Sequence, residues 1–182
     1  MILDIIKLKV KVDLILLRQL RYLKGYLCKV YKRMIKMEKK KVFISGSRGF
    51  TYLPIDFKEA IEWLVELGSH EFLVGDCAGT DLLVQQLLYG MHCKDVTIYC
   101  SGNYPRNFNG SVAWRINRLG FPKPEVNGGD LVAYYALKDI RMSRDCDKAL
   151  VLWNGSSRAT KNNIDRLKEM GKKVVLFNYG SE

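Results

Sequence analysis

The chain has 182 residues, of which 48% are hydrophobic, so it is large and apolar enough for one folded domain with an appendage. Its net charge of +11 is unevenly distributed, because residues 1–40 hold 12 Lys and Arg against 3 Asp and Glu, whereas residues 41–182 hold 18 against 16. Nucleic-acid binding by residues 41–182 is therefore not supported, since it depends on clustered positive charge.

Membrane insertion, secretion and a disulfide framework are also disfavoured. No uninterrupted apolar stretch approaches the roughly 20 residues of a membrane span, and charges interrupt every candidate core of a signal peptide. The five cysteines are odd in number and form no Cys-x-x-Cys pair, which favours reduced thiols over disulfides or a zinc site. We expect a cytoplasmic protein with no bound metal.

Residues 1–40 are predicted to form a basic amphipathic helix. Apolar residues recur at alternating steps of four and three, and Lys and Arg fill most of the remaining positions; the apolar series is Leu16, Leu20, Leu23, Leu27, Val30 and Met34. Three interpretations stay open. The helix docks on its own domain or on a second copy, giving a homo-oligomer; it contacts a membrane or RNA; or natural translation begins at Met37.

From residue 41 onward, short apolar runs alternate with helical patterns, which predicts an α/β domain over residues 41–182 with a central parallel sheet of about five strands. The expected elements, in chain order, are a strand at 42–45, a helix at 55–67, a strand at 72–74, a helix at 81–89, a strand at 96–100, a helix at 130–144, a strand at 149–153, a helix at 162–170 and a strand at 174–177. Residues 101–129 are rich in Gly, Asn and Pro and predict a long loop with a helical turn near residues 113–119.

Three loops follow predicted strands and precede predicted helices, which places them at the carboxyl edge of the sheet, where open α/β sheets bind ligands. In the first, Gly46, Ser47 and Arg48 suit a phosphate, because exposed amides and a guanidinium favour anions. The alternative is a tight turn with a solvated arginine.

The second loop carries Asp76, Gly79, Thr80 and Asp81. One of its two carboxylates is expected to accept hydrogen bonds from ribose hydroxyls. The other, or Thr80, is expected to cap the following helix.

The third loop runs from Trp153 through Gly155 and Ser157 to Thr160. Its amides and hydroxyls suit phosphate oxygens, although Ser and Thr also cap helices. Trp153 is placed either to stack on a base or to be buried at the strand end.

A fourth pattern, Lys138-Asp139-x-x-Met142, lies inside a predicted helix. Adjacent helical residues point about 100° apart, so Lys138 and Asp139 are not expected to face one spot. His70 and His92 stand apart from each other and are interpreted as structural, which leaves no Ser-His-Asp arrangement.

Together these segments resemble the SLOG superfamily, which includes the lonely-guy phosphoribohydrolases and the DNA-processing Smf proteins, and most of all its small YspA/YpsA-related branch. The matching motifs are Gly-Ser-Arg-x-Phe at 46–50, Gly-x-x-x-Gly-x-Asp at 75–81, Lys-Asp-x-x-Met at 138–142 and Trp-x-Gly-x-Ser-x-Gly-Thr at 153–160. The resemblance covers residues 41–178. It implies a Rossmann-like three-layer sandwich, neighbouring first and fourth strands, and a nucleotide-derived ligand.

Two departures from the family pattern bear on activity. Ala159 stands where the family has the glycine before Thr160, which we expect to narrow the phosphate loop. The lonely-guy enzymes carry a glutamate shortly after this loop, whereas residues 161–164 are Lys-Asn-Asn-Ile.

The leading hypothesis is a domain that binds a nucleotide or NAD-derived ligand without catalysis of its own. A rival hypothesis is a nucleoside or nucleotide N-glycosidase that uses Asp81, Asp139 or Asp165 as its carboxylate. A third is an interaction protein that reaches membrane or RNA through residues 1–40.

Overall fold

The computed structural model describes residues 39–125 and 129–180, and the predicted amphipathic helix lies outside these residues. From Lys39 onward the described residues belong to one compact unit. Its elements, in chain order, are β1 (Lys40–Gly46), α2 (Ile55–Glu66), β2 (His70–Val74), α3 (Thr80–Gly90), β3 (Val96–Cys100), β4 (Arg115–Arg118), α4 (Gly129–Asp145), β5 (Lys148–Trp153), α5 (Arg158–Glu169) and β6 (Lys173–Asn178).

The six strands form one sheet in the order β4-β3-β2-β1-β5-β6, and every neighbouring pair is parallel. The α/β class and the Rossmann-like arrangement are thus confirmed, with one strand more than expected. β1 lies beside β5, with Ile44 opposite Leu150 and Gly46 opposite Leu152. The chain leaves β1 toward β2, β3 and β4 on one side and continues from β5 to β6 on the other, so a topological switch point lies between β1 and β5.

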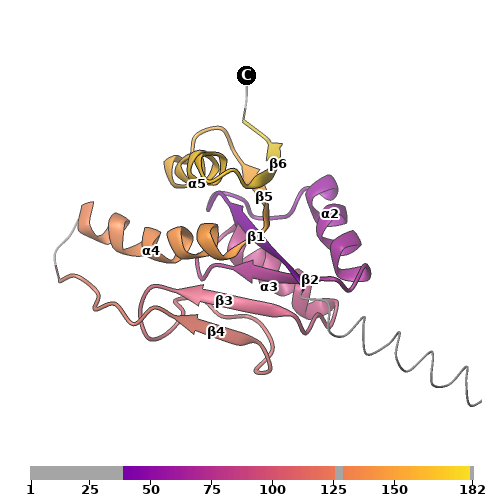
Figure 1. The fold of residues 1–182 in the computed structure, drawn as a ribbon, viewed down its shortest axis with the longest axis horizontal. Helices are drawn as coiled ribbons and strands as arrows, with labels where there is room; N and C mark the ends of the chain where they lie inside the picture. The colour runs from indigo at the N-terminus through magenta and orange to yellow at the C-terminus, as the bar shows by residue number, and fades with distance from the viewer. Residues whose placement is uncertain (1–38, 126–128, 181–182) are drawn as a thin grey trace, which may run out of the picture. The chain divides into compact units, whose positions relative to one another are not determined.

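Successive side chains along each strand point to opposite faces of the sheet, and this divides the core into two layers. In β1, Val42 and Ile44 pack with α2 and α3, whereas Phe43 packs with α4 and α5. Figure 1 shows α4 and α5 on one side of the sheet and α2 on the other. Side chains buried on both faces explain why the central strands read as continuous apolar runs.

Two predictions near the ends of elements are wrong. Residues 115–118 form the edge strand β4 and not a helical turn, and they pair in parallel with β3. α5 begins at Arg158, four residues before the predicted start, because Ser157 is its N-cap. Ala159 and Thr160 therefore lie in a helix and not in a loop.

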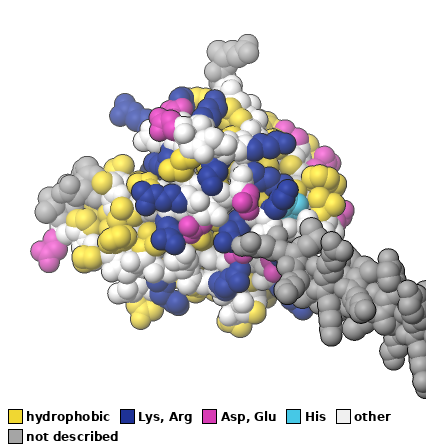
Figure 2. All heavy atoms as spheres, viewed as in Figure 1, with side chains coloured by type: hydrophobic (Ala, Val, Ile, Leu, Met, Phe, Trp, Pro, Cys, Tyr) yellow, Lys and Arg dark blue, Asp and Glu magenta, His cyan; other side chains and the backbone are white. Residues whose placement is uncertain are grey.

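Charged side chains of both signs are mixed on one face of this unit. On the face drawn in Figure 2, Lys and Arg are spread out with Asp and Glu between them. None of the described helices is long and apolar enough to cross a membrane.

Candidate functional site

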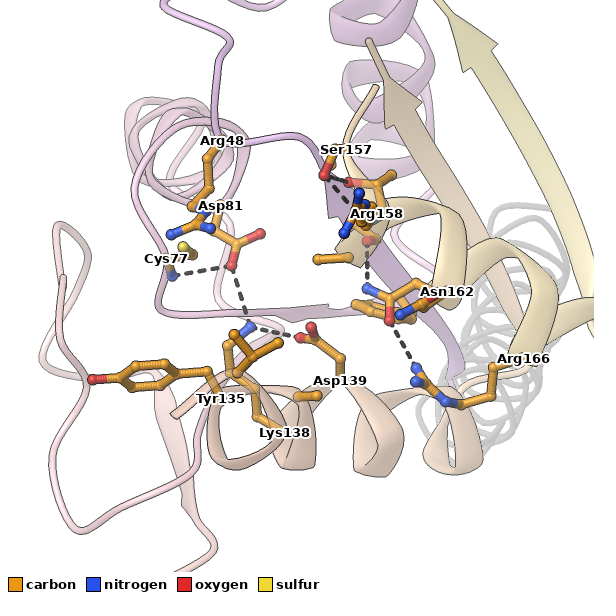
Figure 3. A pocket seen from close by; sticks show the side chains of 18 of the residues that line it. Arg48, Cys77, Asp81, Tyr135, Lys138, Asp139, Ser157, Arg158, Asn162 and Arg166 are labelled. Atoms are coloured by element: carbon orange, nitrogen blue, oxygen red, sulfur yellow. Dashed lines mark hydrogen bonds and ion pairs between the residues drawn. The ribbon is translucent and has the colours of Figure 1, made fainter. Parts of the chain in front are cut away.

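A cavity of about 450 Å³ opens at the carboxyl ends of β1 and β5, the position of the switch point. Its walls come from the end of β1, the loops that follow β1 and β2, one face of α4 and the first turns of α5. Figure 3 shows Lys138 and Asp139 of α4 along one wall, with Arg48 and Ser157 across from each other. The volume falls within the range of small-molecule pockets.

About half of the residues proposed from sequence for the site line this cavity. Those that line it are Gly46, Arg48, Asp81, Asp139, Ser157 and Thr160. Those that do not are Ser47, Asp76, Gly79, Thr80, Trp153, Gly155 and Asp165.

Hydroxyl groups join the loop after β1 to the start of α5. The Ser47 hydroxyl is buried, lies 3.2 Å from the Thr160 hydroxyl and accepts the Asn154 amide N–H at 3.2 Å. The Thr160 hydroxyl donates to the Ser157 hydroxyl at 3.0 Å, and the Ser157 hydroxyl also accepts the Thr160 amide N–H as the N-cap. Ser47 thus links the ends of β1 and β5 to the first turn of α5. Ser157 caps that helix, which is the alternative to phosphate binding that the sequence left open for the third loop.

The second loop packs closely against the backbone of the loop that follows β1. Gly79 has a φ of 76°, and a Cβ there would meet the backbone of Arg48. Gly79 is also the N-cap of α3, which has no side-chain cap, so the prediction that Thr80 or an aspartate caps this helix is wrong. The Thr80 hydroxyl instead donates to the Ser47 carbonyl at 2.8 Å.

Trp153 and Asp165 have partners away from the cavity. The indole N–H of Trp153 donates to the Ser157 carbonyl at 3.2 Å, and its ring packs against the core layer beneath α4 and α5. Asp165 is paired with Lys161 on the outside of α5. Gly155 has a φ of 77° and approaches Gly180.

Asp76 binds an arginine from the long segment between β3 and β4. Arg106 donates from Nη2 to Oδ1 at 2.8 Å, and from Nε and its amide to Oδ2 at 3.2 and 3.0 Å. Burial raises the pKa of Asp76, but the hydrogen bonds and charge of Arg106 outweigh burial and hold that pKa below its usual range. The same guanidinium lies over the ring of Tyr135, 3.9 Å from the ring centroid, and both side chains line the cavity.

A buried ion cluster forms part of the cavity wall. Lys138 is 4% exposed, and its Nζ lies 2.6 Å from Asp139 Oδ1 and 3.5 Å from Asp81 Oδ2. The expectation that Lys138 and Asp139 face different directions is wrong, because the long lysine side chain bends back toward its neighbour (Figure 3). Asp81 also accepts the Cys77 amide N–H at 3.0 Å.

Burial and the neighbouring opposite charges shift the pKa values of Lys138 and Asp81 in opposite directions. Burial disfavours the ammonium of Lys138, but the two carboxylates outweigh burial and raise its pKa. Burial raises the pKa of Asp81 by more than the Lys138 charge lowers it. The carboxylates therefore favour the charged form of Lys138 and balance its charge.

Three further arginines line the cavity, and their environment differs from that of Arg106 and Lys138, which are paired with carboxylates. Among the residues that the structure describes, Arg48, Arg158 and Arg166 form no ion pair with a carboxylate. Arg166 donates to Asn163 Oδ1 at 2.7 Å. Arg158 lies in the first turn of α5, where amide groups add positive potential.

Sequence reasoning missed several lining residues. Arg158, Asn162 and Arg166 are spaced by four, which indicates one helix face. The predicted helix begins at residue 162, so Arg158 falls outside it and the pattern is incomplete there. Arg106 and Tyr135 carry no comparable signal, since their partners are distant in sequence.

Within residues 39–125 and 129–180, no group of three or more His, Cys, Asp or Glu side chains is arranged to hold a metal ion. Comparison of the chain with protein-family models, curated proteins and solved structures found no match.

Proposed function

We propose that the chain binds a small phosphate-bearing ligand, a nucleotide or an NAD-derived molecule, in the cavity at the carboxyl end of β1. The observation that carries this proposal is the group of three arginines, Arg48, Arg158 and Arg166, that line the cavity without a carboxylate partner among the described residues. A guanidinium binds phosphate through two parallel hydrogen bonds, and the amino end of α5 favours the same anion.

The position and size of the cavity support the same proposal. Ligands of open α/β sheets bind at the carboxyl edge where the strand order reverses, and the cavity volume of about 450 Å³ suits a ligand of nucleotide size. The order of the four motifs, which resembles the SLOG superfamily, points to a nucleotide-derived ligand as well.

The proposal is tested by titrating the full chain with a panel of nucleoside mono- and diphosphates, NAD and ADP-ribose in a calorimeter, and by mass spectrometry of small molecules released from the natively purified protein. We expect at least one phosphate-bearing compound to bind with a micromolar or tighter Kd, and unphosphorylated nucleosides to bind much more weakly. Equal binding of nucleosides and nucleotides would overturn the proposal.

A second candidate, N-glycosidic hydrolysis, is favoured by two carboxylates in the cavity wall, Asp81 and Asp139. Both are engaged by Lys138, which counts against either as a free nucleophile or base. Incubation with nucleoside monophosphates, followed by chromatography for free base, separates the candidates. Base release that is lost in Asp139→Asn would establish the enzyme, and binding without release would establish the binding protein.

A further inference from the structure

The two ends of the cavity differ in chemistry. At one end lie Arg158 and Arg166 of α5 together with its N-cap Ser157, and the arginine charges are not balanced by described carboxylates. At the other end, Tyr135 lies under the guanidinium of Arg106 (3.9 Å from Cζ to the ring centroid), and Asp76 balances that arginine. Figure 3 shows Tyr135 and Arg158 on opposite sides of the cavity.

The Asp76 carboxylate fixes the orientation of the Arg106 guanidinium and balances its charge. Two guanidinium nitrogens, Nε and Nη2, donate to the Asp76 carboxylate, and the Arg106 side chain is only 28% exposed. A bidentate pair of this kind fixes the plane of the guanidinium. Such an arginine adds little net attraction for a phosphate, but the face of its guanidinium that is turned away from Tyr135 remains suited to stacking.

Apart from Arg106, aliphatic side chains border Tyr135 in the cavity lining. Leu131, Val132 and Ala136 of the same helix also line the cavity. A flat aromatic surface bordered by aliphatic side chains suits an uncharged ring and offers little to a second phosphate or a sugar.

From these observations we propose that Tyr135 and Arg106 form a subsite for the aromatic ring of the ligand, which would be a nucleobase held opposite the phosphate end at α5. The inference rests on the proposed function, because it names the second half of the ligand in the same cavity. It also assigns ring binding to α4 and the β3–β4 segment and not to Trp153, which lies outside the cavity.

The test compares ligands that differ only by the ring. The full chain is titrated with ribose 5-phosphate and with the 5′-monophosphates of adenosine, guanosine, cytidine and uridine. We expect at least one nucleotide to bind about tenfold or more tightly than ribose 5-phosphate, within the range that stacking of one base gives.

The variants isolate the role of the tyrosine ring. Tyr135→Ala is expected to abolish the preference for the nucleotide while leaving the Kd for ribose 5-phosphate unchanged, and Tyr135→Phe is expected to keep the preference. Tyr104→Ala is the matched control, since Tyr104 lies two residues from Arg106, is 82% exposed and does not line the cavity.

Each outcome decides the inference separately from the proposed function. If ribose 5-phosphate binds but no nucleotide binds more tightly, or if Tyr135→Ala keeps the preference, the ring subsite is wrong and the phosphate site stands. If neither ribose 5-phosphate nor any of the nucleotides binds, both are wrong.

Discussion

The ammonium of Lys138 lies 2.6 Å from Asp139 and 3.5 Å from Asp81, so one buried cation joins α4 to the first turn of α3. The contact brings two helices from opposite faces of the sheet together beyond its carboxyl edge. A buried charge is stable only while it is paired, so this cluster couples the integrity of the cavity wall to the stability of the fold.

Replacing Lys138 with methionine is expected to lower the free energy of unfolding by about 3–5 kcal/mol at pH 7, because Asp81 then stays buried without its counter-charge. The loss of Lys138 also raises the pKa of Asp81 further. A raised carboxyl pKa in the folded state gives stability at low pH that disappears as pH rises, so the deficit should shrink toward pH 5.

Urea unfolding at pH 5 and pH 7 measures both effects. Lys161→Met is the control, because the Lys161–Asp165 pair is solvent-exposed and is expected to contribute no more than about 1 kcal/mol. Similar small losses in both variants would show that the buried cluster does not stabilise the fold.

Gly75→Ala is expected to disrupt the same cluster by crowding. A Cβ at residue 75 would clash with Asp81 Oδ2 and would lie 2.5 Å from Lys138 Nζ. Overpacking of this kind costs on the order of 1–3 kcal/mol. Gly90→Ala in α3 is the matched control, since nothing lies within 4 Å of a Cβ there. Thermal melting should therefore distinguish the two alanines, and equal melting temperatures would contradict the geometry of the cluster.

Ala159 is expected to behave as a residue of the first helical turn. Its backbone is part of α5, so a glycine adds no useful freedom and should cost roughly 0.5–1 kcal/mol of stability. Ala159→Gly should leave nucleotide affinity unchanged, while Ala159→Val should weaken it by filling the cavity that Ala159 lines. A gain in affinity for the glycine variant, measured by calorimetry, would restore the view of residue 159 as part of a flexible loop.

His70 is expected to make stability depend on pH. It is 7% exposed, and burial together with the Lys148 charge, 3.0 Å away, lowers its pKa below the ordinary value of about 6.5. The unfolded chain then binds the proton more readily than the folded chain, so this contribution is complete above pH 6.5 and is lost as pH falls below it.

His70→Gln removes the titrating group and should flatten this part of the profile. The measurement is the difference between parent and variant in unfolding free energy from pH 7.5 to pH 5. A difference that does not change with pH would mean that His70 titrates alike in both states.

The sheet was largely predictable from sequence, and there is a physical reason why the strand β4 was not predicted. Strands buried on both faces, such as β3 with Ile98 in one core layer and Tyr99 in the other, give apolar runs that short-range patterns detect. β4 pairs on one edge only and reads Arg-Ile-Asn-Arg, so no apolar run marks it.

The position of the cavity was predictable from sequence, but many of its lining residues and their partners were not. Loops at strand ends must meet at one edge of a parallel sheet, which explains why Arg48 and Ser157 both line the cavity. The pairing of Asp76 with Arg106 spans 30 residues, and no local rule anticipates it. Hydroxyls assigned to a ligand, such as that of Ser47, proved to be bonded within the protein.

The most direct test of phosphate binding is calorimetric titration of ADP into the full chain and into Arg48→Ala. Arg48 is exposed at the cavity wall and makes no ion pair within the described residues, so its removal should leave the melting temperature unchanged. Loss of a charge-assisted hydrogen bond should weaken ADP binding by about 1.5–3 kcal/mol, or at least about tenfold in Kd. Arg144→Ala, an exposed α4 variant away from the cavity, should bind ADP like the parent. Equal ADP affinity in the parent, Arg48→Ala and Arg144→Ala would contradict the assignment of this cavity to a phosphate-bearing ligand.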